Sequence, residues 1–250
     1  MRSYTLVLSY DGTGYHGWQE QPHSVTVAGT LLNSYKRVFG CDASIVGASR
    51  TDAGVHALGQ VARVLSPIDM DPETLRRAWN AALPHDILIR SLRSSLNDFH
   101  PHHRVIEKVY YYHVFFKKPL PIVARYGYRF PFSFDKQKFE HALQFFVGEH
   151  DFWSFCTEES PDVNSICTVN TIVLEKLPRY NALRVVIKGD RFLYRMIRRI
   201  VGSALRISAT PKRSVDEIAL ALKERHSRHL FQTAPPQGLL LRKVRYTDPE

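Results

Sequence analysis

The sequence is poor in cysteine and has no long hydrophobic run. Only Cys41, Cys156 and Cys167 occur among its 250 residues. An odd and sparse cysteine count argues against the disulfide framework of small secreted domains and is typical of a reducing cytosol. No stretch of about 18 apolar residues is present, so a membrane-spanning helix is not expected. We therefore predict a cytoplasmic protein without a membrane partner.

Several common catalytic motifs are also missing. Cys156 and Cys167 form no Cys-x-x-Cys pair, and the histidine-rich run 99–103 lacks close partners, so we expect no metal. The absence of Gly-x-Ser-x-Gly argues against a serine hydrolase. The run 12–17 matches Gly-x-Gly-x-x-Gly, but no helix pattern opens there and no acid follows at the required spacing. We interpret it as a glycine-rich turn rather than a dinucleotide-binding loop.

The sequence has the composition of an ordinary globular protein, with more basic than acidic residues. Hydrophobic residues make up 44% and charged residues 23%, which excludes disordered and collagen-like chains. Lys and Arg number 34 against 24 Asp and Glu, a net charge of +10. The window 179–213 holds ten basic residues and one acid, Asp190. Such focusing favours a nucleic acid partner, with an anionic small molecule or a solvated basic face as alternatives.

Hydrophobic periodicity and turn residues predict an α+β fold in two halves. The halves span 1–105 and 106–250, and residues 117–131, with three prolines, read as a loop. Strands are expected over 4–10, 43–48, 60–65, 87–94, 109–116, 171–177, 183–188 and 239–246. Helices are expected over 27–39, 71–83, 135–147 and 192–205, with a further one opening at the capping box that begins at Ser214.

The most informative loop covers residues 47–56 and lies between two predicted strands. Glycines and small residues surround one carboxylate, Asp52, and Arg50 precedes it by two positions. Such a loop turns tightly and lets a ligand approach its backbone. From the residues alone, a turn in which Asp52 caps local amides is the favoured interpretation.

Two further groups of residues suggest RNA contacts. Arg191, Arg195 and Arg198 would share one face of the predicted helix, with Arg199 at its border, and arginine suits a phosphate backbone. An ordinary solvated helix face is the alternative. In the strand that follows Lys108, Tyr110 either packs in the sheet or stacks on an unstacked base.

Together these motifs resemble the tRNA pseudouridine synthase A family. The resemblance runs almost end to end, and the run from Arg50 to His56 is its most specific part. The other matching elements are Tyr10–Thr13 with Gly17–Gln19, Phe99–His100, Lys108–Tyr112, His150–Phe152 with Phe155, Phe192–Arg198 with Gly202, and Ala234–Leu239.

This resemblance implies a catalytic role for Asp52, with Arg198 paired to it. Tyr110 would contact the target base and Arg50 would engage RNA. Arg195 and Arg199 are expected to bind RNA as part of the basic helix. The implied substrate is uridine in the tRNA anticodon arm, at nucleotides 38, 39 and 40, and no cofactor or metal is required. The implied fold has two similar α/β-sandwich-like halves whose mainly antiparallel sheets join around a central basic cleft, and the protein would act as a homodimer.

The sequence departs from the family pattern at three positions. Ser49 replaces a usual glycine, His102 occupies the arginine position of the Phe-His-Ala-Arg element, and Asn170 replaces a usual arginine. These departures bear on RNA affinity and site selection more than on the chemistry. Two other functions stay open at this point. One is an RNA-binding module without catalysis, and the other is an anion-handling enzyme that uses the glycine-rich loop.

Overall fold

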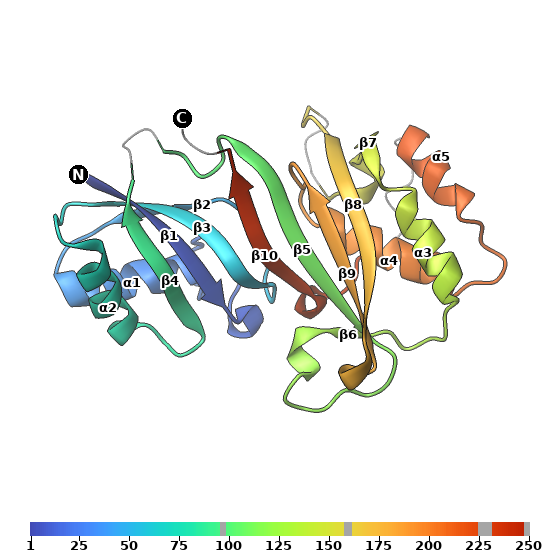
Figure 1. Cartoon of the computed structure of the whole chain (residues 1–250), viewed down its shortest axis with the longest axis horizontal. Helices are drawn as coiled ribbons and strands as arrows, with labels where there is room; N and C mark the ends of the chain where they lie inside the picture. The colour runs from blue at the N-terminus through green and yellow to red at the C-terminus, as the bar shows by residue number, and fades with distance from the viewer. Residues whose placement is uncertain (96–98, 158–161, 225–231, 248–250) are drawn as a thin grey trace. The chain divides into compact units, whose positions relative to one another are not determined.

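The structure is a computed structural model that describes residues 1–95, 99–157, 162–224 and 232–247 (Figure 1). It divides into two compact units. Unit 1 comprises Met1–Ile106 and Leu240–Glu250, and unit 2 comprises Glu107–Leu239. The closing strand, which we predicted as part of the second half, therefore belongs to unit 1. Position in the sequence does not decide this assignment, because strands can pair with partners far away along the chain; within unit 1, Leu240 and Leu241 pair in parallel with His56 and Ala57.

Unit 1 contains a sheet in the strand order β4-β1-β3-β10. The strands are β1 (Arg2–Tyr10), β3 (His56–Ser66), β4 (Ile87–Ser94) and β10 (Leu239–Tyr246), and β2 (Ser44–Gly47) also pairs with β3. β3 runs antiparallel to β1 and β2 and parallel to β10. In β1, large apolar side chains occupy alternate positions, and this period of two buries Tyr4, Leu6, Leu8 and Tyr10.

Helices α1 (Val27–Phe39) and α2 (Pro72–Ala82) pack together and complete the core of unit 1. Thr26 caps the start of α1 by accepting from the Gly29 amide, and Gly40 ends it in the left-handed conformation. The buried Trp79 of α2 donates its indole N–H to the Leu31 carbonyl of α1 at 3.1 Å. A buried indole with a satisfied N–H fixes how the two helices meet.

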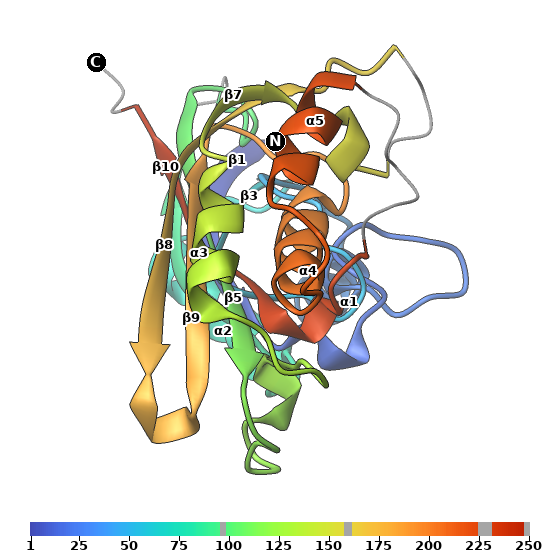
Figure 2. The same cartoon turned by 90° about the vertical axis from the view of Figure 1, so that its right-hand side faces the viewer.

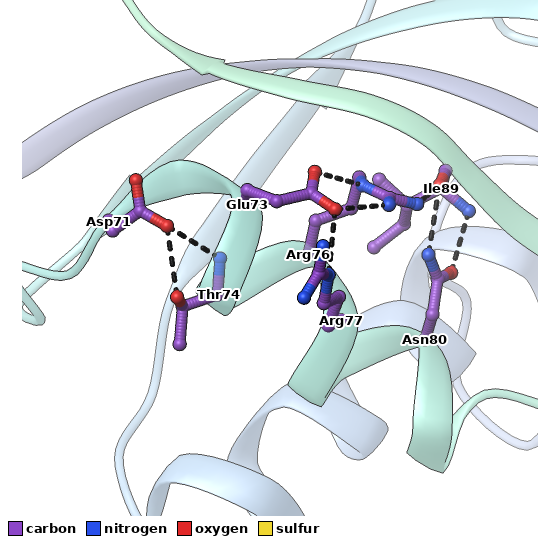
Figure 3. Close-up of polar contacts among 7 residues, drawn as sticks. All are labelled: Asp71, Glu73, Thr74, Arg76, Arg77, Asn80 and Ile89. Carbon is purple, nitrogen blue, oxygen red and sulfur yellow. Dashed lines mark hydrogen bonds and ion pairs between the residues drawn. The ribbon is translucent and has the colours of Figure 1, made fainter.

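Polar contacts tie α2 to β4 and fix its first turn (Figure 3). The Asp71 carboxylate accepts from the Thr74 amide at 2.9 Å, which caps the helix. The Glu73 carboxylate forms ion pairs with both Arg76 and Arg77. At the other end, Asn80 exchanges two 2.9 Å hydrogen bonds with the backbone of Ile89. α2 is therefore anchored to the strand that follows it.

Unit 2 contains a sheet in the strand order β5-β9-β8-β7. The strands are β5 (Val105–Phe115), β7 (Gly148–Asp151), β8 (Ile166–Leu177) and β9 (Ala182–Gly189), and the short β6 (Tyr128–Arg129) pairs with β5. All of these pairs are antiparallel except β5 with β6.

Three helices cover one face of this sheet, as Figure 2 shows. They are α3 (Lys136–Gln144), α4 (Met196–Ser208) and α5 (Asp216–Glu224). α3 packs on α4, and both bury large side chains. Fully buried rings dominate this core: Tyr112, Phe139, Phe146, Phe152 and Phe155.

These observations confirm the α+β class and the mainly antiparallel pairing. Two strands were not expected: β6 and β7 are short and carry no alternation of apolar residues. The 117–131 loop includes β6 and the short 3-10 turn η2 (Ala124–Tyr126). Within the described residues, none of the helices combines the length and the apolar character needed to cross a membrane.

The expected helix over 192–205 is wrong at its start, because α4 begins at Met196. The Asp190 carboxylate accepts from the amides of Thr168 (3.0 Å) and Arg191 (2.6 Å). Such local bonding competes with helix formation. Arg195 then adopts a left-handed conformation with φ of 59° before the helix begins. Arg191 and Arg195 therefore precede the helix, and the predicted three-arginine face does not form.

Candidate active site

Asp52 lies in the loop that joins β2 to β3. The loop runs from Ala48 to Val55, so the predicted position between two strands is correct. Asp52 is half-buried, while Arg50 is exposed. The loop therefore carries two charged side chains, and Arg50 is more accessible to solvent than Asp52.

The backbone on both sides of Asp52 is fixed by the segment that follows β1. The Trp18 amide donates to the Thr51 carbonyl at 3.0 Å, and the Gly54 amide donates to the Tyr15 carbonyl at 3.2 Å. Within the loop, the Val55 amide donates to the Asp52 carbonyl at 3.1 Å. Two motifs that are well separated in the sequence thus meet, and the first immobilises the second.

Glycine is required in this supporting segment because the two chains touch. A Cβ atom on Gly12 would lie 2.0 Å from the Val55 carbonyl oxygen. Gly17 has φ of 93°, and a Cβ atom there would lie 2.6 Å from the Thr51 carbonyl oxygen. Both positions exclude any side chain. The Gly-x-Gly-x-x-Gly run is therefore a turn that braces the Asp52 loop, as its interpretation as a glycine-rich turn predicted.

Buried polar side chains hold the start of the same loop. Gln60 is fully buried, accepts from the Ser49 amide at 3.2 Å and donates to the Ser49 carbonyl at 2.6 Å. The hydroxyls of Tyr10 and Thr51 are 2.8 Å apart. The Gly12 amide donates to Nδ1 of the buried His56 at 3.1 Å. Tyr10 and His56 belong to the quoted motifs, but the sequence alone assigned no role to them or to Gln60.

The structure shows the surroundings of the three residues that depart from the family pattern. Ser49 is buried and its backbone is held by Gln60, but its hydroxyl has no hydrogen-bond partner among the described residues. His102 contacts the Gly47 carbonyl through Nε2 at 2.7 Å, at the point where β2 ends and the Asp52 loop begins. Asn170 is exposed at an irregularity in the pairing of β8 with β9.

In unit 2, Tyr110 lies on β5 and is mostly buried. Its ring meets Phe192 edge to face, with the ring centres 5.3 Å apart. Lys108 lies two residues before it and so on the same face of the strand. Burial lowers the pKa of the Lys108 ammonium to about 8, and the charge of Asp190 opposes that shift.

Arg198 of α4 contacts the segment that contains Ala234. Its Nε donates to the Ala234 carbonyl at 2.8 Å, and the Ala234 amide donates back to the Arg198 carbonyl at 3.0 Å. Two glycines let the Ala234 segment approach. A Cβ atom on Gly202 would lie 2.0 Å from the Gln232 carbonyl oxygen, and one on Gly238 would lie 2.4 Å from the Tyr112 ring.

The other arginines of this region differ in their surroundings. Arg195 is exposed, with its guanidinium 4.7 Å from the centre of the Tyr194 ring. Arg199 is 6% exposed and donates to the Ser154 carbonyl at 3.2 Å. The expected position of Arg199 at the border of a solvated basic face is therefore wrong. It lies on the side of α4 that packs against the turn containing Ser154.

The structure thus brings Asp52 and Arg50 together on one loop of unit 1. It places Tyr110, Arg195, Arg198 and Arg199 in unit 2. The pairing of Asp52 with Arg198 stays a prediction. Among the residues that the structure describes, no cluster of His, Cys, Asp or Glu could hold a metal ion.

Comparison with known proteins identifies the family. The model of the tRNA pseudouridine synthase family matches residues 6–102 and 142–247. The tRNA pseudouridine synthase A of Acetivibrio thermocellus is 34% identical over 247 residues, which are 98% of this chain and 100% of that protein. The protein of the same name from a Geobacillus species is 38% identical over 242 residues, 96% of each chain.

Among solved structures, the crystal structure of the archaeal box H/ACA sRNP Nop10-Cbf5 complex is 13% identical with a TM-score of 0.35. The match covers 96% of this chain and 47% of that chain. The motif resemblance is confirmed by the family model and by the relatives, which match over nearly the whole length. The chain belongs to the tRNA pseudouridine synthase A family, a family of isomerases.

Proposed function

We propose that this chain isomerises uridine to pseudouridine at nucleotides 38, 39 and 40 of the tRNA anticodon stem-loop. In this proposal Asp52 is the catalytic nucleophile or base. The reaction breaks the bond between N1 of uracil and C1′ of ribose and forms a bond between C5 and C1′. Nothing is oxidised and no group is added, so the chemistry requires no cofactor and one carboxylate can suffice.

The observation that carries the proposal is the immobilised Asp52 loop. Backbone hydrogen bonds fix the residues on either side of Asp52, and Gly12 and Gly17 permit the close approach that makes these bonds. A carboxylate that reacts with a ribose or a base must be held in place, because a displacement of about 1 Å can cost about 100-fold in rate. A surface loop that merely caps its own amides would not need this bracing.

The remaining site residues take the following roles in the proposal. Arg198 pairs with the Asp52 carboxylate. Tyr110, whose ring plane is fixed by Phe192, contacts the target base. Arg50 and Arg195 are exposed and bind phosphates of the RNA. Leaving the base stack costs a few kcal/mol, which these contacts offset.

The test is pseudouridine mapping on unmodified tRNA transcripts with the unaltered protein and with Asp52→Asn. The unaltered protein is expected to modify nucleotides 38–40. The variant removes the nucleophile or base but keeps the size of the side chain, so activity should vanish while tRNA binding stays within about threefold. Normal turnover by Asp52→Asn would disprove the role of Asp52. Modification at other nucleotides would disprove only the site assignment.

The proposal includes a cytoplasmic homodimer. The three cysteines form no disulfide with one another, which is consistent with a reducing compartment. The dimer rests on the family resemblance. Sedimentation equilibrium of the purified protein would test it, and a monomer at micromolar concentration would contradict it.

A further inference from the structure

The proposed function leaves one exposed segment of unit 2 without a role. It follows β5 and spans Lys117–Phe132, and we name it the basic arm. It carries four cations, Lys117, Lys118, Arg125 and Arg129, and no acid occurs between Glu107 and Asp135. All four cations are exposed. Figures 1 and 2 show the arm projecting from the end of unit 2 where β5 ends.

The returning limb of the arm is firmly attached to unit 2. The β6 residues Tyr128 and Arg129 pair with Val114 and Phe115 of β5. A Cβ atom on Gly127 would lie 2.4 Å from the Phe115 ring, so the two limbs are in close contact. The buried Phe130 then packs against Phe134, with ring centres 5.8 Å apart. The projecting tip is therefore carried on a fixed base.

The arm exposes large apolar side chains among its cations. Ile122 is 77% exposed, Leu120 67% and Phe132 57%, and Tyr126 is 39% exposed. Single exposed apolar residues are ordinary, but several in one short segment are typical of a binding surface. The combination of cations with exposed rings and aliphatic groups suits a ligand that offers both anions and flat apolar faces.

The arm also borders the residues that hold Arg198. Its turn η2 (Ala124–Tyr126) lies beside the turn η5 (Pro236–Gly238). Just before η5, the Ala234 carbonyl accepts from Arg198 and the Pro235 carbonyl accepts from the Tyr112 hydroxyl at 2.8 Å. A ligand that reaches Arg198 therefore comes within the neighbourhood of the arm.

We propose that the basic arm is a second RNA-binding surface, which grips the tRNA beside the nucleotide being modified. Its cations bind backbone phosphates, and its apolar tip contacts bases that lose their stacking partner when the target uridine leaves the helix. The proposal rests on the proposed function. RNA is favoured over a second copy of this chain, because a symmetric contact between two arms would bring eight cations together without an acid.

The first test removes charge from the arm in Lys117→Gln/Lys118→Gln. Its matched control is Lys212→Gln/Lys223→Gln, which removes two equally exposed lysines of unit 2 outside the arm. Binding of an unmodified tRNA transcript is measured over a series of KCl concentrations. The arm variant should bind about 3- to 10-fold more weakly at low salt, with the slope of log Kd against log[KCl] reduced by roughly 1.4–1.8. The control pair should change neither quantity appreciably.

Two outcomes of this test would overturn the proposal. One is unchanged binding by the arm variant. The other is an equal loss in both pairs of variants, since that would reflect the net charge of the molecule rather than a surface on the arm.

The second test removes the apolar tip in Ile122→Ser. The KM for tRNA should rise about 3- to 10-fold with the salt slope unchanged, because stacking and apolar contact are lost while the cations remain. The sedimentation coefficient should not change. A variant that alters the oligomeric state but binds the transcript normally would show that the tip is a protein interface and would overturn the proposal.

Failure of the arm can be distinguished from failure of the proposed function. If the unaltered protein forms pseudouridine and both arm variants bind the transcript normally, only the arm proposal is wrong. If the unaltered protein forms no pseudouridine, the proposed function is wrong, and the binding measurements still decide whether the arm contacts RNA.

Discussion

At the scale of single residues, glycines contribute most to the geometry of the proposed site. Gly12 and Gly17 contact the backbone of the Asp52 loop, and Gly202 and Gly238 let the Ala234 segment reach α4 and Tyr112. Each contact is made by main-chain atoms or a fixed ring, which cannot move aside as a flexible side chain could. Because no side chain fits at these four positions, the glycines set where Asp52 and Arg198 lie within their units.

Gly12→Ala is expected to slow catalysis strongly. Its new Cβ would lie 2.0 Å from the Val55 carbonyl oxygen, so the loop must move. A shift of this size should lower kcat by about 10- to 100-fold, measured as single-turnover pseudouridine formation. Gly14→Ala is the matched control, because nothing lies within 4 Å of its Cβ position, and it should react at the normal rate. Equal rates for the two variants would contradict the bracing role of Gly12.

Substitution of Arg199 should lower stability, whereas substitution of Arg195 should weaken the salt dependence of tRNA binding. Arg199→Ala removes a buried hydrogen bond to the Ser154 carbonyl and should lower the free energy of unfolding by about 1–3 kcal/mol, read from urea denaturation. Arg195→Ala changes an exposed side chain and should leave stability within about 0.5 kcal/mol. It should instead reduce the salt slope of tRNA binding by about 0.7–0.9. The opposite assignment of the two effects would contradict this division.

At the scale of secondary structure, local signals in the sequence decided which elements could be predicted. The helix over 27–39 was predicted with its observed bounds, because Gly40 ends it in a left-handed conformation. The strands over 87–94 and 239–246 were predicted equally well from their composition and turn residues. Where capping, periodicity and turn chemistry agree, sequence alone is sufficient.

Elements that depend on distant partners could not be predicted. The start of α4 is delayed where the Asp190 carboxylate accepts a hydrogen bond from the amide of Thr168, a residue of β8. The arginine pattern suggested a continuous helix and gave no sign of that contact. In the same way, the loop sequence around Asp52 indicated a functional site, but its support by Gly12, Gly17 and Gln60 became apparent only in three dimensions.

Helix α2 should lose stability in acid through Glu73. Its contacts with Arg76 and Arg77 lower the pKa of this exposed carboxyl to about 2, from an ordinary value of 4.5. A lowered pKa in the folded state stabilises the protein above about pH 4.5, and the contribution disappears as the pH falls towards about 2. Glu73→Gln should therefore be less stable than the unaltered protein near neutral pH and converge with it towards pH 2. A constant difference across this range would contradict the assignment.

At the scale of the whole molecule, the two units are interleaved in sequence. Unit 1 begins the chain and is completed by Leu240–Glu250, with all of unit 2 between. β10 buries Leu241 and Val244 and pairs with β3, the strand that begins where the Asp52 loop ends. The last strand therefore supports the loop that carries the proposed catalytic residue.

Truncation after Leu239 should weaken unit 1 more than unit 2. The deletion leaves the sequence of unit 2 complete but removes the β10 partner of β3. Hydrogen exchange should accelerate first in β3 and the Asp52 loop, while the amides of α3 and α4 keep more of their protection. Equal loss of protection in both units would indicate that they unfold together.

The interleaving of the units has a consequence during protein synthesis. A ribosome delivers β3 and the Asp52 loop early, but β10 emerges only after every residue of unit 2 has been translated. A nascent chain therefore cannot complete the sheet beneath Asp52, even though the residues of the loop are already present. The sheet of unit 1 is complete only after β10 has been synthesised, so translation products truncated before β10 would carry Asp52, the proposed catalytic residue, without that strand.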